Sequence, residues 1–178
     1  MLQSKIKCQK GKITMTIHPI RPIYDKNSKI LILGSFPSVK SREEKFFYAH
    51  AQNRFWRVVS AVFEKPVPES IAEKKAFLID CGIALWDVVQ SCEISASSDS
   101  SIKNVTANDI SPILKSANIQ KIFTNGKTAD KYYNKYIKNR VKISALCLPS
   151  TSAANAAWSL KQLTDAWSVI NFNLSDNI

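Results

Sequence analysis

The sequence predicts an α/β fold with a parallel sheet covered by helices on both faces. Its 178 residues are 45% hydrophobic, enough for one domain with a sizeable core. Four short apolar runs are each bounded by turn residues, and segments with helical spacing lie between them. Strands that alternate with helices are typical of parallel sheets, whose connections cross over one face or the other.

The four apolar runs are the predicted strands. The first is rich in Ile and Leu without alternation, as expected for a central strand buried on both faces. The third stops at Asn125-Gly126 and the fourth at Pro149, which are turn signals. The predicted strands, in chain order, are Lys29–Gly34, Gly82–Val89, Gln120–Thr124 and Lys142–Leu148.

Helical patterns fill the intervals. Asn53 is placed to cap the first helix, and Pro112 suits the first turn of a short one. The predicted helices cover residues 55–63, 70–79, 112–117, 127–138 and 160–170. Residues 1–28, broken by Pro19 and Pro22, read as an irregular arm or an edge strand, and Ser95–Ser101 as a loop.

Net charge points to a polyanionic partner. Lys and Arg total 25 against 14 acidic residues, a formal charge of +11 that favours phosphate contacts and counterion release. Charge alone leaves DNA, RNA and an acidic membrane surface open. The N-terminus lacks the apolar segment of a signal peptide and no stretch has the length of a membrane-spanning helix, so a cytoplasmic location is expected.

The cysteines and histidines do not have the spacing of a metal site. Cys8, Cys81, Cys92 and Cys147 form no CxxC pair, and only two histidines are present. We therefore expect reduced thiols, no bound metal and no cofactor.

Polar and glycine-containing segments follow the predicted strands, where parallel sheets bind ligands. Gly34–Ser38 (GSFPS) begins with a glycine that lets the backbone approach a ligand, although an ordinary turn would also explain it. Without GxGxxG or a P-loop lysine, nucleotide binding is poorly supported. Phe46–Trp56 interleaves aromatic residues with His50, Asn53 and Arg54, as a stacking surface for an extruded base would; a self-packed loop with Asn53 as helix cap is the alternative.

Three further segments follow the remaining strands. The Asp87 carboxylate could accept hydrogen bonds from a base, or simply cap a turn. Asn125 could read a base edge and Lys127 could meet phosphate, although an ordinary turn before a helix would look the same. Ser150–Ser152 offers three hydroxyls without charge, which suits a DNA groove or a helix cap.

The order and spacing of GSFPS, YAHAQNRFW, GIALWDVV, TNGKTA and LPSTSAANA strongly resemble the uracil-DNA glycosylase superfamily, most closely its DNA-deoxyinosine branch, over residues 16–172. The resemblance implies a single three-layer αβα domain across 1–178, with a four-stranded parallel sheet and residues 1–28 packed on it as an arm. It implies a monomeric, metal-free enzyme that flips a deaminated base, with hypoxanthine as the first expectation, out of double- or single-stranded DNA and cleaves its N-glycosidic bond by water attack. A catalytically silent DNA-binding relative and a uracil-preferring enzyme are the alternatives.

The resemblance also implies roles for individual residues. Asn53 matches the asparagine that this branch is thought to use for water positioning, and Asp87 lies where other branches contact the base. Ala51 and Ala153 replace prolines usual in the branch, which removes stiffness from two loops. The expected catalytic residues are Asn53, Ser35 and Asp87; the expected base pocket is Gly34, Phe36, Pro37, Tyr48, Trp86 and Asn125; the expected DNA contacts are Ser38, His50, Arg54, Lys127, Ser150, Thr151, Ser152 and Asn155.

Overall fold

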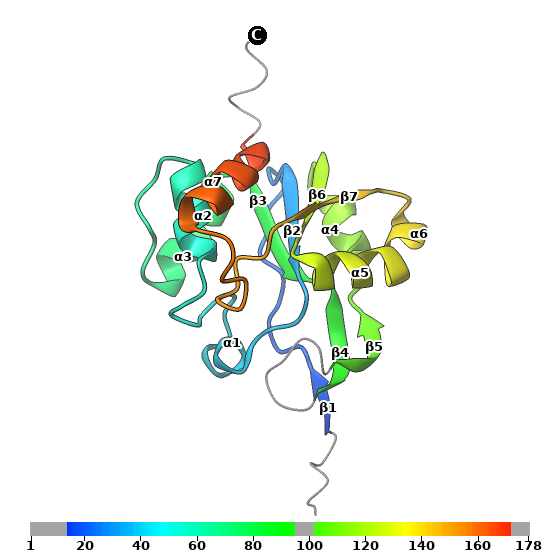
Figure 1. Ribbon diagram of the computed structural model, residues 1–178. Helices are drawn as coiled ribbons and strands as arrows, with labels where there is room; N and C mark the ends of the chain where they lie inside the picture. Colours follow the sequence, from blue (N-terminus) through cyan, green and yellow to red (C-terminus); the bar gives the residue numbers. More distant parts are fainter. Residues whose placement is uncertain (1–13, 95–101, 172–178) are drawn as a thin grey trace, which may run out of the picture.

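The computed structural model describes residues 14–94 and 102–171. At its centre lies a four-stranded parallel sheet in the order β3-β2-β6-β7, which confirms the predicted α/β fold and its four strands (Figure 1). The strands are β2 (Ile30–Gly34), β3 (Ile83–Asp87), β6 (Lys121–Asn125) and β7 (Ala145–Leu148). The first strand of this sheet in chain order, β2, has β3 on one side and β6 on the other, so the strand order reverses there.

Helices cover both faces of this sheet, which gives the three predicted layers (Figure 1). One face carries α2 (Phe55–Val62), α3 (Ile71–Asp80) and α7 (Leu160–Trp167), the last continued by the short 3-10 helix η2 (Ser168–Ile170). The other face carries α4 (Ser111–Ser116), α5 (Lys127–Tyr136) and α6 (Lys138–Val141).

Alternate residues of β2 supply two separate cores. Ile30 and Ile32 belong to the cluster that contains Phe55 of α2 and Trp167 of α7. Leu31 and Leu33 belong to the cluster that contains Tyr133 of α5 and Ile113 of α4. Because every residue of β2 is buried, the strand needs no polar face, and this explains its continuous apolar run.

A second, antiparallel sheet has the order β1-β4-β5 and was not expected as a sheet. It consists of β1 (Thr14–Ile17), β4 (Val89–Ile94) and β5 (Lys103–Ala107). The apolar run 82–89 therefore spans β3 and the first residue of β4, since the chain leaves the parallel sheet after Asp87 and enters this one. The N-terminal arm supplies its edge strand, β1, which pairs with β4, and Ile23 forms an isolated bridge with Leu85.

Sequence reasoning missed two short helices, α6 and α1 (Val39–Glu44), the second of which follows the GSFPS segment. The Ser38 side chain caps it by accepting from the backbone N–H of Ser41 at 3.2 Å. Over residues 14–94 and 102–171, no helix combines the length and the apolar character needed to cross a membrane.

Candidate active site

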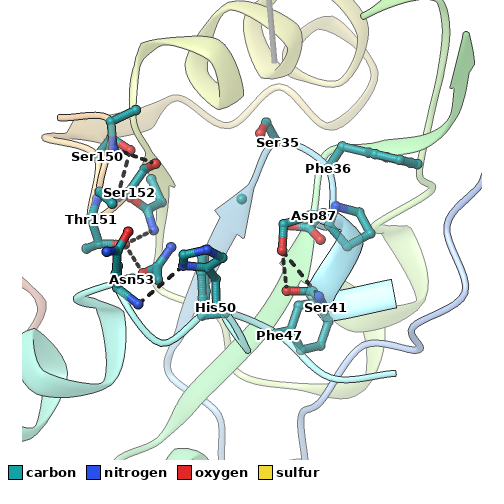
Figure 2. A pocket seen from close by; sticks show the side chains of 18 of the residues that line it. Ser35, Phe36, Ser41, Phe47, His50, Asn53, Asp87, Ser150, Thr151 and Ser152 are labelled. Atoms are coloured by element: carbon teal, nitrogen blue, oxygen red, sulfur yellow. Dashed lines mark hydrogen bonds between the residues drawn. The ribbon is translucent and has the colours of Figure 1, made fainter. Parts of the chain in front are cut away.

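A cleft of about 510 Å³ opens at the carboxyl ends of the parallel strands. Gly34 ends β2, Asp87 ends β3, Asn125 ends β6, and Ser150 lies two residues beyond β7. The cleft thus lies at the reversal of strand order, where ligands bind in open parallel sheets. Figure 2 shows Ser35, Phe36 and Asp87 across the opening from Asn53, Ser150, Thr151 and Ser152.

The GSFPS segment forms one wall of the cleft. Arg42 of α1 holds it in place by donating from Nη1 to the Pro37 carbonyl oxygen at 2.8 Å. The same guanidinium lies 5.7 Å from the centre of the Phe36 ring, within the range of a cation–π contact. The wall is therefore supported by a helix that immediately follows it.

Asp87 lies at the base of the cleft and is only 4% exposed. Its Oδ2 lies 2.8 Å from Nε2 of His18, which comes from the N-terminal arm. Its backbone carbonyl accepts from Nδ2 of Asn108 at 2.9 Å. A buried carboxylate of this kind needs partners, and the arm provides one that the strand-end motifs did not reveal.

Gly34 has no space for a side chain, because the Asp87 carboxylate occupies it. A Cβ at residue 34 would lie 2.1 Å from Oδ1 of Asp87 and 3.0 Å from the Tyr48 hydroxyl. The glycine at the end of β2 thus allows the carboxylate of the neighbouring strand to lie across it.

Asn53 lies on the wall opposite the GSFPS segment (Figure 2), where it is hydrogen-bonded to Thr151. Its Oδ1 accepts the backbone N–H of Phe55 at 2.9 Å and the Thr151 hydroxyl at 3.1 Å. Figure 2 shows Asn53 beside Thr151. The side chain of Asn125 completes the network, since its Nδ2 donates to Oγ1 of Thr151 at 2.9 Å and its Oδ1 accepts the Thr151 N–H at 3.0 Å. Asn53 therefore ties the start of α2 to the loop after β7.

The two oxygen lone pairs of Asn53 are both engaged in this network. Its Nδ2 makes no hydrogen bond to any residue in the described ranges, so it is the group left to act as a donor to a ligand. The resemblance implied that Asn53 positions a water, and in this geometry the amide nitrogen is the atom available for it. The predicted cap is wrong in position, because Arg54 is the N-cap of α2 and its side chain makes no capping bond. Asn53 lies one residue earlier, where its side chain accepts the N–H of the first helical residue and lines the cleft.

Arg54 has a different environment from the phosphate contact expected of it. Its guanidinium donates to three backbone carbonyls of the loop after β7: Ser152 at 2.8 Å, Asn155 at 2.9 Å, and Trp158. Its backbone N–H also donates to the Thr151 carbonyl at 3.0 Å. The side chain holds the loop in shape instead of reaching into solvent.

We expect Arg54→Ala to lower the free energy of unfolding by about 2 kcal/mol, because three charge-assisted hydrogen bonds are lost. The slope of log K for DNA binding against log salt should stay at the wild-type value, since the guanidinium is engaged by loop carbonyls and we expect no phosphate contact from it. Thermal unfolding and a salt titration of binding measure the two effects. A slope reduced by about one unit would restore the phosphate assignment.

Most of the residues expected at the site do line the cleft. Four do not: Trp86, Arg54, Lys127 and Asn155. Trp86 lies on a strand whose side chains alternate between faces, and its Nε1 donates to the Ile20 carbonyl at 3.1 Å. Asn155 uses its Nδ2 within its own loop, bonding the Ser150 carbonyl at 2.9 Å.

Several cleft residues were not predicted. They are Ser41, Arg42, Phe47, Gln52, Ala153 and Ala154, together with His18, which touches the cleft through Asp87. Density of polar and aromatic residues near GSFPS and NRFW was a usable signal for most of them. Nothing in the sequence marked His18, because its partner is 69 residues away.

The described cysteines differ in burial: Cys92 is buried, Cys81 is partly buried and Cys147 is exposed. Burial raises the pKa of Cys81 to about 11, and burial together with the Asp130 carboxylate raises the pKa of Cys147. Among the described residues, three cysteines are free and no group of His, Cys, Asp and Glu has an arrangement that could hold a metal.

The cleft combines a buried carboxylate, two asparagines, a serine- and threonine-rich loop and a glycine-opened strand end. On a three-layer α/β sheet this is the architecture of a DNA glycosylase that receives an extruded base. The model of the uracil DNA glycosylase superfamily matches residues 21–171, and this chain belongs to that family.

Two relatives from Methanosarcina are similar over most of the chain. One from Methanosarcina acetivorans, called hypoxanthine DNA glycosylase, is 31% identical over 83% of this chain and 93% of its own. One from Methanosarcina barkeri with the same name is 30% identical over 82% and 92%. The solution NMR structure of a protein provisionally described as a uracil DNA glycosylase, from M. acetivorans, superimposes with a TM-score of 0.76 at 28% identity, covering 89% of this chain and 98% of that one.

Proposed function

We propose that this chain is a monomeric, cytoplasmic, monofunctional DNA glycosylase that removes hypoxanthine from DNA in base-excision repair. The observation that carries the proposal is the cleft at the strand ends, in which the buried carboxylate of Asp87 faces a loop able to engage DNA. The names of the two Methanosarcina relatives support hypoxanthine as the base.

A carboxylate acceptor suits hypoxanthine better than adenine. Hypoxanthine carries a proton on N1, which Asp87 would accept, whereas adenine presents a lone pair at N1 and would place two acceptors together. Guanine also carries the N1 proton, so its exclusion has another origin. The weaker pairing of a deaminated base in the duplex makes it easier to extrude and accounts for part of that selectivity.

Bond cleavage in this cleft needs little activation of the nucleophile. Asn53 has no useful pKa for general base catalysis, and we assign it to position a water by its amide. That suffices when the glycosidic bond breaks ahead of attack and the sugar acquires oxocarbenium character. Backbone N–H groups of the Ser35–Phe36 turn would stabilise the departing base as it gains electron density.

The loop after β7 is the proposed DNA contact. Ser150 Oγ accepts the Ser152 N–H at 3.2 Å, and Ser152 Oγ accepts the Ala154 N–H at 3.3 Å, so both hydroxyls also shape the loop. Their protons remain to be donated to phosphate oxygens. The net charge of +11 supplies the remaining, sequence-independent attraction.

Replacing Ser150 and Ser152 together with alanine is expected to weaken binding to an abasic-site analogue by about tenfold, since two phosphate contacts and two turn-forming bonds are lost. Fluorescence anisotropy with labelled duplex measures this. Ser116→Ala on α4, which removes a hydroxyl bonded only to the Pro112 carbonyl, is the matched control and should bind as wild type. Unchanged affinity in the double variant would remove the loop from the interface.

A panel of oligonucleotides tests the function itself. Hypoxanthine, uracil, xanthine and a mismatched thymine are offered in otherwise identical single strands and duplexes, and abasic product is followed. Hypoxanthine should be excised fastest. A faster reaction with uracil would identify a uracil-preferring enzyme. The description of the M. acetivorans NMR structure as a uracil DNA glycosylase is the reason for including uracil. DNA binding without abasic product at any enzyme concentration would indicate a silent relative.

A further inference from the structure

His18, from the N-terminal arm, is a partner of the Asp87 carboxylate that lies outside the strand-end segments. Its side chain is 1% exposed and that of Asp87 is 5% exposed. The imidazole is surrounded by aromatic rings: Phe36 at 5.9 Å, Phe47 at 6.2 Å and Trp86 at 6.4 Å between centroids.

The arm is fastened on both sides of this histidine. The backbone N–H of His18 donates to the Gln90 carbonyl of β4 at 2.7 Å. Two residues later, the Ile20 carbonyl accepts from the Trp86 indole at 3.1 Å. The imidazole therefore has a fixed place beneath the cleft, and its orientation is determined by backbone as well as by packing.

A backbone contact determines the tautomer of His18. The N–H of Ile20 points at Nδ1 at 3.1 Å, and since a backbone N–H can only donate, Nδ1 must be an acceptor. The ring proton therefore lies on Nε2, 2.8 Å from Oδ2 of Asp87, and is donated to that oxygen. A protonated carboxyl at Oδ2 would instead require Nε2 as acceptor, which would leave the ring proton facing another donor.

The two carboxylate oxygens of Asp87 therefore have different partners. Oδ2 accepts from His18, and Oδ1 lies against Gly34 at the end of β2, where a Cβ would come within 2.1 Å of it. Gly34 and Asp87 both line the cleft. Because Oδ2 is engaged by His18, Oδ1 is the carboxylate oxygen left to accept from a ligand in the cleft.

We propose that His18 is a positioning residue for base recognition. As a neutral Nε2–H donor, it holds Asp87 so that Oδ1 accepts a hydrogen bond from the imino N–H of the flipped base. This rests on the proposed function, in which the flipped base is hypoxanthine and the N–H that Oδ1 would bind is its N1–H. His18 itself does not touch the base; it acts through Asp87.

Asp87→Asn gives the sharpest test, because the tautomer decides which way the amide turns. With Nε2–H as donor, His18 holds the amide oxygen and the amide NH₂ faces the base, opposing its N1–H. Excision of hypoxanthine should then fall at least a hundredfold. If Nε2 were an acceptor, it would bind the amide NH₂ and leave an oxygen in the cleft. Near wild-type excision by folded Asp87→Asn would overturn the proposal.

Variants of His18 test positioning through base discrimination. Excision of hypoxanthine is compared with that of 1-methylhypoxanthine, which lacks the imino proton. His18→Phe keeps an aromatic ring in place without the donor, and should reduce the wild-type ratio of rates at least tenfold. His18→Gln carries one amide donor and one acceptor, and should restore part of the ratio. A folded His18→Phe protein with the wild-type ratio contradicts the role.

Two further measurements separate the possible failures. Met15→Ala, an exposed position on the same arm, is the control and should leave the ratio unchanged. Nitrogen-15 shifts of the His18 ring report the tautomer without any reaction, and a protonated Nδ1 would overturn the inference even if His18→Phe does not fold. Absence of hypoxanthine excision by the wild-type protein would instead refute the proposed function, while the ring shifts still decide the pairing.

Discussion

Asn53→Ala is expected to lower kcat for hypoxanthine excision by about a hundredfold or more, with little change in DNA affinity. The physical reason is the loss of the amide that we assign to the attacking water. The substitution also removes the acceptor of the Phe55 N–H and of the Thr151 hydroxyl, which should lower the free energy of unfolding by about 1 kcal/mol. Single-turnover kinetics and thermal unfolding measure the two effects separately.

Asn53→Asp is the matched variant for this prediction. A carboxylate keeps both acceptor contacts of the framework but replaces the NH₂ donor. If the nitrogen acts on the water, Asn53→Asp should be as defective as Asn53→Ala while melting near the wild-type temperature. Full turnover in Asn53→Ala, with only the loss of stability, would limit Asn53 to a structural role at the start of α2.

Gly34→Ala is expected to lower hypoxanthine excision by about as much as Asn53→Ala does. The added methyl group would fall 2.1 Å from Oδ1 of Asp87, so the carboxylate must move and its bond to His18 must weaken or break. Displacing a buried carboxylate from its hydrogen-bond donor in this way should cost about 3 kcal/mol of stability and lower excision at least a hundredfold. Thermal unfolding and the hypoxanthine cleavage assay provide the measurements.

A second glycine offers the control. Gly82 lies at the opposite end of β3, and a Cβ there would meet nothing nearer than 3.7 Å, although its φ of +66° makes alanine strained. Gly82→Ala should therefore lower stability by about 1 kcal/mol through backbone strain, with unchanged kcat. Equal losses of kcat in the two variants would show that the effect of Gly34→Ala is general destabilisation and not displacement of Asp87.

Local sequence was sufficient to predict the parallel sheet. The strand β2 is an unbroken run of Ile and Leu because both of its faces are covered, and that pattern is visible without any structure. The helix starts were also readable where a capping box occurs, as at Ser70 with Glu73, because the cap involves neighbours in the chain.

The ends of the strands and the second sheet could not be predicted as well from local sequence. The run 82–89 looks continuous, yet the chain changes sheets after Asp87, where the backbone carbonyls of Gly34 and Ser35 accept the N–H groups of Val88 and Val89. Those partners lie on β2 and the segment after it. Strand exchange of this kind depends on pairing between distant segments, which composition and periodicity do not encode.

The sequence by itself determined the α/β class, the placement of polar residues at the strand ends and the resemblance to the glycosylase superfamily, because each depends on residues close together in the chain. Tertiary structure alone decided which atoms face the cleft. It turned Arg54 inward to three loop carbonyls, engaged the amide oxygen of Asn53, and placed His18 beneath Asp87. These are contacts across about a hundred residues or between separate sheets, set by packing and hydrogen-bond geometry after the chain has folded.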